Sequence, residues 1–386
     1  MKKQIIILFI LNIFCINKGK QFDNSMDLFN TLGMFLHYLA YNSETIQLTK
    51  RHSHTATLLT NGKVLIVGGN DDTTALDSVK LYDPSSGEIS TVENLNEARY
   101  EHTATLLQNG NVLIAGGRNF NNALDTTETY DPDKSTFTQG NSLSTKRTNH
   151  TASLLLDGTV LLAGGYSYST NTDGTFSSTN LSSVDIYDLN SSSPTTVTMN
   201  EARNKHTATV LPSGQVLIVG GVDESGAYLS NSETFDTSTN TFSFTTLSLN
   251  QARCSHAASL LLNGKVLITG GNNFAGYLSS AEVYDSNTNN FSYLSNQNSM
   301  NISRVSHTST LLYNGKVLLV GGDTSSNSSE LYDPSTDSFS SISSLAISIQ
   351  SHTATILSNG NVLITAGSNR NDATNNIYVY NPSSDN

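Results

Sequence analysis

Arginine and histidine recur together along this chain, at a spacing that suggests two kinds of chemistry. Clustered arginines can bind an anion, because fixed positive charge focuses the local field. Repeated histidines suggest a metal, because neutral imidazole is the commonest metal ligand. Six arginines stand three residues before a histidine, and a seventh histidine has Ile349 in the arginine position; the arginines are Arg51, Arg99, Arg147, Arg203, Arg253 and Arg304, and the histidines are His54, His102, His150, His206, His256, His307 and His352.

The spacing of the histidines argues against a metal. In a closed ring of seven sheets ~10 Å apart, equivalent positions across the ring lie about 23 Å from one another, whereas zinc ligands sit ~2 Å from the metal. Within the repeats only His52 and His54 are close in sequence. We therefore expect each histidine to bond the backbone of a neighbouring repeat, and we expect no metal and no cofactor.

The arginines allow two interpretations. Five repeats carry an acid two residues before a conserved-position aromatic, namely Glu128, Asp185, Glu233, Glu282 and Glu330, whereas the first repeat has Lys80 and the seventh has Tyr378. Pairing within each repeat leaves only Arg51 without an acid, so we favour structural ion pairs. The alternative is an anion-binding rim formed by the six repeated arginines together with Arg118 and Arg370, which fall in loops expected on the same face. All six and Arg118 stay candidate ligand contacts.

Aromatic residues mark a second candidate for ligand binding. The loops that follow each Gly-Gly pair differ in length, and the longest carries Tyr166, Tyr168 and Phe176. Variable loops on one side of a rigid scaffold are where recognition usually lives. Exposed aromatic rings suit sugar stacking or protein contact. Packing of these rings within their own loops is an equally good interpretation.

The elements that position these residues form a repeated unit. Each copy has a strand beginning at the histidine, a two-residue turn such as Asn61-Gly62, an uninterrupted apolar strand ending in Gly-Gly, a third strand ending in an aromatic, and a fourth strand. Asn-Gly tolerates the positive φ of a type I′ hairpin. A short strand without polar alternation is expected to be buried on both faces, as in a small sheet flanked by two others.

The units predict an all-β, seven-bladed propeller with four antiparallel strands per blade. The seventh unit lacks its own fourth strand, and the segment around Tyr41 has the matching spacing, so we expect an N-terminal strand to complete the last blade. Residues 41–386 resemble the kelch family of β-propellers in their Gly-Gly pairs, following aromatics and hairpin spacing. Departures are Ala366-Gly367 in the last copy, Phe235 for the usual tyrosine, and the absence of tryptophan.

The start of the chain predicts export. Lys2 and Lys3 precede an apolar run from Ile5 to Phe14, which is typical of a secretory signal and too short for a comfortable transmembrane helix. We interpret residues 1–20 as a signal peptide or lipoprotein signal, with Cys15 as the lipidation candidate, and residues 21–40 as a spacer. The protein is then secreted, or held at the cell surface or outer membrane through a lipid anchor alone.

Composition limits the partners. Twenty Lys and Arg against 32 Asp and Glu give a net charge of −12, which argues against nucleic acid. We expect a monomer that binds a protein or glycan through the face bearing the arginines and long loops, and no catalytic residue is assigned. The kelch resemblance implies an alternative, a carbohydrate-active enzyme such as a galactose-oxidase-like copper radical oxidase or a sugar epimerase. The oxidase would need a Tyr–Cys crosslink, for which Cys254 is the candidate thiol.

Overall fold

The computed structural model describes residues 47–170, 175–294, 299–323, 328–342, 349–369 and 372–385. The chain divides into Met1–Thr45 and Ile46–Asn386, and every described residue belongs to the second unit. The sequence-based interpretations of the signal, Cys15, the spacer and the N-terminal strand around Tyr41 therefore lie outside the described residues, as does Arg370. No helix in the described segments is long and apolar enough to cross a membrane.

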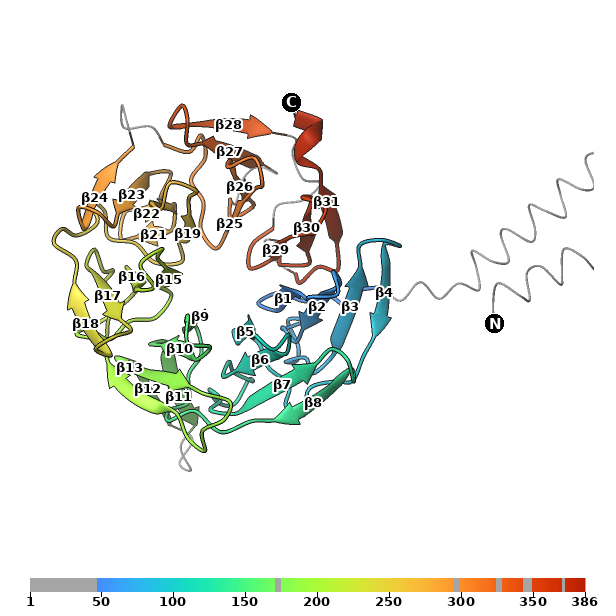
Figure 1. Cartoon of the computed structure of the whole chain (residues 1–386). Helices are drawn as coiled ribbons and strands as arrows, with labels where there is room; N and C mark the ends of the chain where they lie inside the picture. The colour runs from blue at the N-terminus through green and yellow to red at the C-terminus, as the bar shows by residue number, and fades with distance from the viewer. Residues whose placement is uncertain are drawn as a thin grey trace, which may run out of the picture. The chain divides into compact units, whose positions relative to one another are not determined.

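The second unit is a ring of seven antiparallel sheets, here called blades 1 to 7 (Figure 1). Blade 1 contains β1 (Thr55–Leu58), β2 (Val64–Val67), β3 (Val79–Asp83) and β4 (Glu88–Thr91). Blade 2 contains β5 (Thr103–Leu106), β6 (Val112–Ala115), β7 (Thr127–Asp131) and β8 (Thr136–Gln139). Blade 3 contains β9 (Thr151–Leu154), β10 (Val160–Ala163), β13 (Ser183–Tyr187) and β14 (Thr195–Thr198). Blades 4 and 5 contain β15 (Thr207–Val210), β16 (Val216–Val219), β17 (Ser232–Asp236) and β18 (Thr241–Phe244); and β19 (Ala257–Leu260), β20 (Val266–Thr269), β23 (Ala281–Asp285) and β24 (Asn290–Tyr293). Blades 6 and 7 contain β25 (Thr308–Leu311), β26 (Val317–Val320), β27 (Ser329–Asp333) and β28 (Ser338–Ile342); and β29 (Thr353–Ile356), β30 (Val362–Thr365) and β31 (Ile377–Tyr380).

The second strand of every blade is buried along its whole length, as its unbroken apolar sequence predicts. In β2, Leu65 and Val67 face blade 2 and pack with Val112 and Ile114. The alternate residues of β2 face blade 7 instead. Seven such clusters lie between neighbouring blades, so the hydrophobic core is a set of interfaces around the ring.

The ring closes through the same bonds that join its other blades. The second glycine of each Gly-Gly pair donates its N–H to the carbonyl of the next blade, for example from Gly117 to Arg147 at 2.9 Å. The corresponding bond from Gly367 to Arg51, also 2.9 Å, joins blade 7 to blade 1. The sheet of blade 7 has three strands in the part of the chain that the structure describes.

A belt of left-handed residues circles the axis immediately before the repeated histidines. Six N–H groups of this belt donate to the carbonyl of the same position in the preceding blade, at 2.9–3.4 Å. Glu101 donates in this way to Ser53, and Ser53 donates to Ser351. The belt residues are Ser53, Glu101, Asn149, Lys205, Ser255, Ser306 and Ser351, with φ between 50° and 54°.

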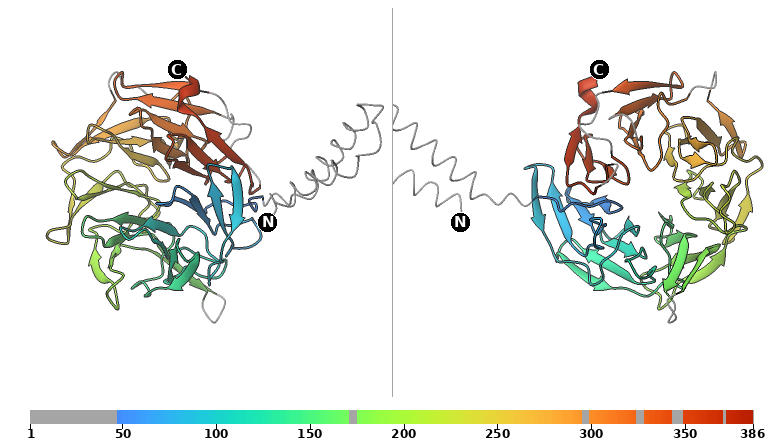
Figure 2. Two further views of the ribbon diagram at one scale, coloured as in Figure 1. Left: turned by 45° about the vertical axis from the view of Figure 1, so that its right-hand side comes forward. Right: turned by 180° about the vertical axis from the view of Figure 1, so that it is seen from behind.

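Two rims follow from the meander of strands within each blade. The connections from second to third strand and from fourth strand to the next blade emerge on one rim, which we call the loop face. The turns between first and second strands and between third and fourth strands emerge on the other rim, the turn face. The first strand of each blade lies nearest the centre of the ring (Figure 1), and the view from behind in Figure 2 shows the blades in the same order around it.

Two loops of the loop face contain hairpins of their own. The long loop of blade 3 folds into β11 (Tyr166–Thr170) and β12 (Phe176–Asn180), which pair over five residues. The loop of blade 5 contains the shorter pair β21 (Asn272–Asn273) and β22 (Gly276–Tyr277). The third repeat has the longest loop in the sequence, and this loop thus forms the two paired strands β11 and β12.

Candidate functional site

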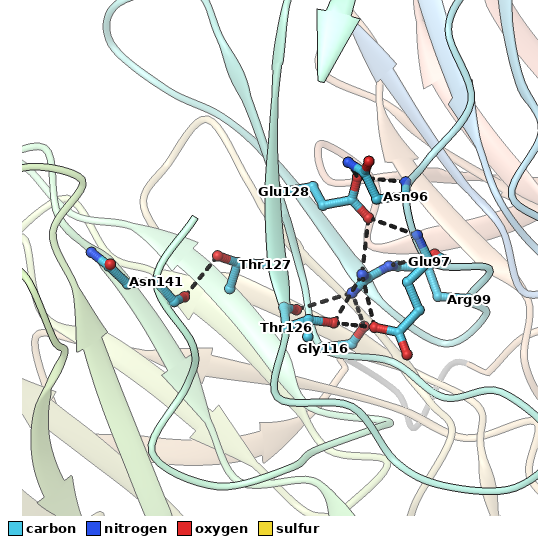
Figure 3. Close-up of polar contacts among 8 residues, drawn as sticks. All are labelled: Asn96, Glu97, Arg99, Gly116, Thr126, Thr127, Glu128 and Asn141. Carbon is cyan, nitrogen blue, oxygen red and sulfur yellow. Dashed lines mark hydrogen bonds and ion pairs between the residues drawn. The ribbon is translucent and has the colours of Figure 1, made fainter. Parts of the chain in front are cut away.

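The six repeated arginines lie inside the blades, and all six are fully buried. Figure 3 shows Arg99 as the example. Its Nη1 donates to the carbonyls of Gly116 and Thr126 at 2.9 and 3.0 Å, and its Nη2 donates to Thr126 Oγ1 and Glu128 Oε1 at 3.0 and 3.1 Å. Its Nε donates to the carbonyl of Glu97 at 3.2 Å. A guanidinium has five N–H donors, so Arg99 has none left for a ligand.

The predicted ion pairing of arginine and acid within the same blade is confirmed for blades 2 to 6. Arginine and acid are bonded in blades 2 to 6: Arg99 with Glu128, Arg147 with Asp185, Arg203 with Glu233, Arg253 with Glu282 and Arg304 with Glu330, at N–O distances of 2.8–3.4 Å. The acids also organise the entry to the blade, because Glu128 Oε2 accepts bonds from the backbone N–H and the side chain of Asn96 at 2.8 Å.

Arg51 is the exception that the sequence predicts. With Lys80 in the acid position, its Nη2 donates to the hydroxyl of Ser78 at 2.9 Å instead of to a carboxylate. Burial without a carboxylate partner lowers the pKa of Arg51 to about 10. In blade 7 the arginine position is Ile349, which is fully buried in an apolar cluster. The hypothesis that the six repeated arginines contact a ligand therefore gives way to the structural interpretation, and an anion-binding rim built from them is not formed.

The repeated histidines join neighbouring blades, but through side chains and not through the backbone as we expected. His102 Nε2 bonds Thr55 Oγ1 of blade 1 at 2.9 Å, and His150 Nε2 bonds Thr103 Oγ1 of blade 2 at 3.1 Å. Hydroxyl groups of the preceding blade fill this role for all seven histidines. Burial lowers the pKa of His102, His206, His307 and His352 to about 3, so the rings are neutral.

The repeated histidines, together with nearby backbone carbonyls, leave no room for a side chain at the Gly-Gly pairs. A Cβ at Gly116 would lie 2.6 Å from the carbonyl oxygen of Arg147 and 2.9 Å from Cε1 of His150, both in the next blade. A Cβ at Gly117 would lie 2.7 Å from Cβ of His102 in its own blade. Among the described residues no group of three or more His, Cys, Asp or Glu side chains is placed to hold a metal ion.

Among the candidate arginines that the structure describes, Arg118 reaches the surface, with 32% of its side chain exposed. A pair of backbone hydrogen bonds, at 2.9 and 3.0 Å, sets Arg118 beside Tyr100 at the entry to blade 2. Glu101 binds the guanidinium with both oxygens, at 2.7 Å to Nε and 3.1 Å to Nη2. Burial opposes the charge of Arg118, but the Glu101 carboxylate outweighs it and raises the pKa of Arg118.

Aromatic rings enclose this ion pair. The Arg118 guanidinium carbon lies 4.6 Å from the centre of the Tyr100 ring and 5.9 Å from that of Tyr168, within the range of cation–π attraction. Tyr168 stacks with Tyr166 at a centroid distance of 6.0 Å, and Tyr100 contacts Phe120 at 5.8 Å. We call Tyr100, Glu101, Arg118, Phe120, Tyr166 and Tyr168 the aromatic cluster.

The hairpin of blade 3, which carries Tyr166 and Tyr168 of the aromatic cluster, is held by hydrogen bonds to blade 2 on one edge and to blade 4 on the other. The hydroxyl of Tyr168 donates to the carbonyl of Asn119 in the blade 2 loop at 2.7 Å. On the other edge, Asn180 Nδ2 donates to the carbonyl of Val222, and Asn204 Nδ2 donates to Asn180 Oδ1 at 2.6 Å, both contacts with blade 4. The hairpin therefore bridges the loops of three consecutive blades and presents a fixed surface.

Of the three hairpin aromatics named from the sequence, two join the cluster and one stands apart. Tyr166 and Tyr168 are half-buried against it. Phe176 is 73% exposed at the start of β12, opposite Thr170 in the ladder. Tyr100 and Glu101 were missed by sequence reasoning, although Glu101 is the one acid among the residues that immediately precede the repeated histidines.

Cys254, the thiol that the oxidase alternative requires, is buried beside the blade 5 hairpin. Its Sγ lies 3.2 Å from Oδ1 of Asn272, whose Nδ2 donates to the hydroxyl of Tyr228 at 3.1 Å. Burial raises the pKa of the Cys254 thiol. Tyr228 itself meets Phe274 edge to face at 4.7 Å.

Comparisons with known proteins agree with this architecture. A family model described as the KLHDC2/KLHL20/DRC7 Kelch-repeats domain matches residues 149–347, and one described as the Attractin/LZTR1 beta-propeller matches residues 16–223. Each matched span exceeds half of the 386 residues. The chain belongs to the kelch-repeat β-propeller family.

The comparison with solved structures shows the same fold. The chain is similar to a fungal alcohol oxidase of the AA5 family in complex with copper, with a TM-score of 0.67 and 16% identity over 86% of this chain and 74% of that chain. At this identity the likeness extends to the fold alone. A search of curated proteins found no significant match.

Proposed function

We propose that this kelch propeller is a non-catalytic binding protein that engages a protein ligand through the aromatic cluster on its loop face. The observation that carries the proposal is the Arg118–Glu101 ion pair, held between the rings of Tyr100 and Tyr168 beside the exposed Phe120. Tyrosine and arginine dominate the energetic centres of protein interfaces. Side chains that are already fixed lose little entropy on binding.

The charge state of the cluster supports a protein ligand over a free anion. Both oxygens of Glu101 contact the Arg118 guanidinium, and Glu101 Oε2 also accepts bonds from Thr148 Oγ1 and Asn149 Nδ2 at 2.9 and 2.8 Å. A free anion would compete with this paired carboxylate at short range. An amphipathic protein surface can instead cover the ring edges and leave the pair intact.

The test is ligand capture by the propeller from an array of extracellular proteins and glycans, with matched exposed phenylalanines. Phe120 is 51% exposed in the aromatic cluster, and Phe244 is 50% exposed on the outer strand of blade 4. Phe120→Ala is expected to weaken capture at least about tenfold, and Phe244→Ala to leave it unchanged. Capture of glycans alone, or equal loss in all variants, would overturn the proposal.

Enzyme activity is tested on the same sample. Stoichiometric copper, with peroxide released during oxidation of a sugar alcohol, would replace the binding proposal with the oxidase alternative. Cys254→Ser separates the two, because a crosslinked cysteine would be essential for that oxidation, whereas the buried thiol described here has no part in ligand capture.

Export is proposed from the sequence of residues 1–20. A secreted or lipid-anchored chain should be found outside the cytoplasm, and anchoring through Cys15 would place it with membranes. Cys15→Ala should then move the protein from the membrane fraction to the soluble fraction. An unprocessed chain in the cytoplasm would contradict export.

A further inference from the structure

A hollow of about 260 Å³ opens on the turn face, between the hairpin turns of blades 6 and 7. It lies on the rim opposite the aromatic cluster and has no part in the function proposed above. Its polar lining consists of Tyr313, Asn314, Asn359, Asn361, Asn381 and Ser383. This volume lies just below the range of about 300–1,000 Å³ that is usual for small-molecule sites, so the hollow has room for a single small unit.

Tyr313 gives the hollow an exposed aromatic wall that is fixed in position. The side chain is 67% exposed. Its hydroxyl donates to the carbonyl of Leu357 in blade 7 at 3.3 Å. Its Cδ2 is 3.3 Å from the place where a Cβ of Gly360 would stand, so the ring rests on a glycine that leaves room for it. The ring is therefore held by blade 7 while much of its surface stays open.

This aromatic is specific to one blade. The residue before the turn pair has the same role in every blade, because it lies against the turn glycine of the next blade. The other occupants of this position are Thr60, Gln108, Leu156, Pro212, Leu262 and Ser358. No structural requirement for an aromatic is visible at these six sites, so the fold alone does not explain Tyr313.

Amide groups supply oriented hydrogen-bond donors beside the ring. Asn314 Oδ1 accepts the backbone N–H of Lys316 at 3.1 Å, and Asn359 Oδ1 accepts that of Asn361 at 3.0 Å. These turn bonds fix which end of each amide is the oxygen. The Nδ2 group of each is left as a donor that no bond among the described residues uses.

The lining carries no charged side chain. The equivalent hollow between blades 5 and 6, of about 440 Å³, has Leu262 in place of the tyrosine and contains the Lys316–Asp333 ion pair at 3.2 Å. The blade 6/7 hollow thus combines an aromatic wall with neutral amides and a hydroxyl. An aromatic ring covers the C–H face of a pyranose, and amides bond its hydroxyl groups without attracting ions.

We propose that the hollow at Tyr313 binds one pyranose unit of a neutral saccharide. The probes are methyl α-D-glucopyranoside and methyl α-D-galactopyranoside, with methyl glucuronide as the charged comparison, observed by saturation-transfer NMR on the full chain. We expect transfer to at least one neutral glycoside and little to the glucuronide. Competition between the neutral glycosides and longer neutral oligosaccharides would give the relative affinities.

Matched variants localise the signal. Tyr313→Ala should reduce affinity about tenfold or more, equal to ~1.4 kcal/mol, whereas Leu262→Ala at the same position of the preceding blade should not. Tyr313→Phe keeps the ring and should retain binding, which separates stacking from loss of fold. Absence of transfer from every neutral glycoside, or equal transfer in wild type and Tyr313→Ala, would overturn the proposal. Phe120→Ala should leave this signal unchanged, so it is independent of the loop-face ligand.

Discussion

Five of the six repeated arginines share their buried position with a carboxylate, and Arg51 does not. Comparing the two cases separates the effect of the ion pair on the free energy of unfolding from the effect of the hydrogen bonds and packing. Removing an arginine from blades 2 to 6 leaves a buried, unpaired acid as well as lost hydrogen bonds. Removing Arg51 costs only the hydrogen bonds and packing. The chain thus contains its own control for the energetics of a buried ion pair.

Arg203→Ala is expected to destabilise the protein by ~3–5 kcal/mol, because it leaves Glu233 buried without its partner. Arg51→Ala should cost clearly less, since no carboxylate is orphaned. Urea unfolding followed by circular dichroism gives both free energies. Equal losses would show that the hydrogen bonds to the blade, and not the ion pair, carry the stability.

Lys80→Glu tests the same principle by gain of an interaction. It places an acid where blades 2 to 6 have one, and it removes the Lys80 cation, whose pKa is lowered by burial and by the nearby charge of Arg51. A new charge-assisted bond should stabilise the fold by about 1–2 kcal/mol. Lys80→Gln is the control that removes the cation without adding the acid, and the prediction fails if the two variants unfold at the same urea concentration.

At the scale of elements, the first glycine of each pair combines a left-handed backbone with a close contact across the blade interface. Gly116 has φ of 58° and no room for a Cβ beside Arg147 and His150. Gly87, in the turn between β3 and β4, has φ of 71° and nothing within 4 Å. The two positions share the backbone strain but not the contact.

Gly87→Ala is therefore expected to cost about 1 kcal/mol, the price of a left-handed alanine. Gly116→Ala adds displacement of a backbone carbonyl and should cost ~3 kcal/mol or more, comparable with severe overpacking. Thermal melts of the two variants compare them directly. Blade 7 already has Ala366 in the Gly116 position, at φ of 53°, so equal melting temperatures would mean that every interface can adjust as that one has.

Sequence reasoning was strongest where one element repeats. The strand pattern and the arginine–acid pairs follow from residues within a single unit, and the structure confirms them. The type I′ turn predicted at Asn61-Gly62 is wrong: Gly62 has a positive φ of 80° but Asn61 does not, and the Gly62 N–H donates to the carbonyl of Leu59 at 2.9 Å, so Thr60 and Asn61 form the turn and the left-handed glycine follows it. Contacts between units were harder to predict. The histidines bond threonine hydroxyls of the preceding blade and not its backbone, and the aromatic cluster joins Tyr100 and Arg118 to Tyr168 of another blade. Such contacts depend on how far one blade is rotated against the next, which no pattern within a unit contains.

At the scale of the whole molecule, seven buried neutral histidines couple folding to protons. Their folded pKa values lie well below the unfolded value of 6.5. The unfolded chain therefore binds more protons as pH falls below 6.5. Stability is fully present above pH 6.5 and is lost progressively toward the folded pKa values, which for four of these histidines are about 3.

The expected slope is steep, approaching about 1.4 kcal/mol per pH unit for each histidine once the unfolded rings are protonated. Between pH 6.5 and 4.5 the histidines act almost alone, because the depressed aspartate pKa values, such as about 2 for Asp83, matter only nearer the unfolded value of 3.8. Urea unfolding across this range measures the slope. His102→Gln should reduce proton uptake by about one, and a flat profile from pH 7 to 5 would contradict the neutral, buried state.

The hydrogen bond from Gly367 to Arg51 and the belt bond from Ser53 to Ser351 repeat, at the junction of blades 7 and 1, the bonds found between other blades. These bonds do not distinguish the junction of blades 7 and 1 from the other junctions, so they do not set the order of the blades along the chain. A circularly permuted chain that joins the residues after β31 to those before Leu48 and opens at an exposed Asn-Gly turn should rebuild the same ring. Duplication and reshuffling of single blades would have met few physical barriers in such a molecule.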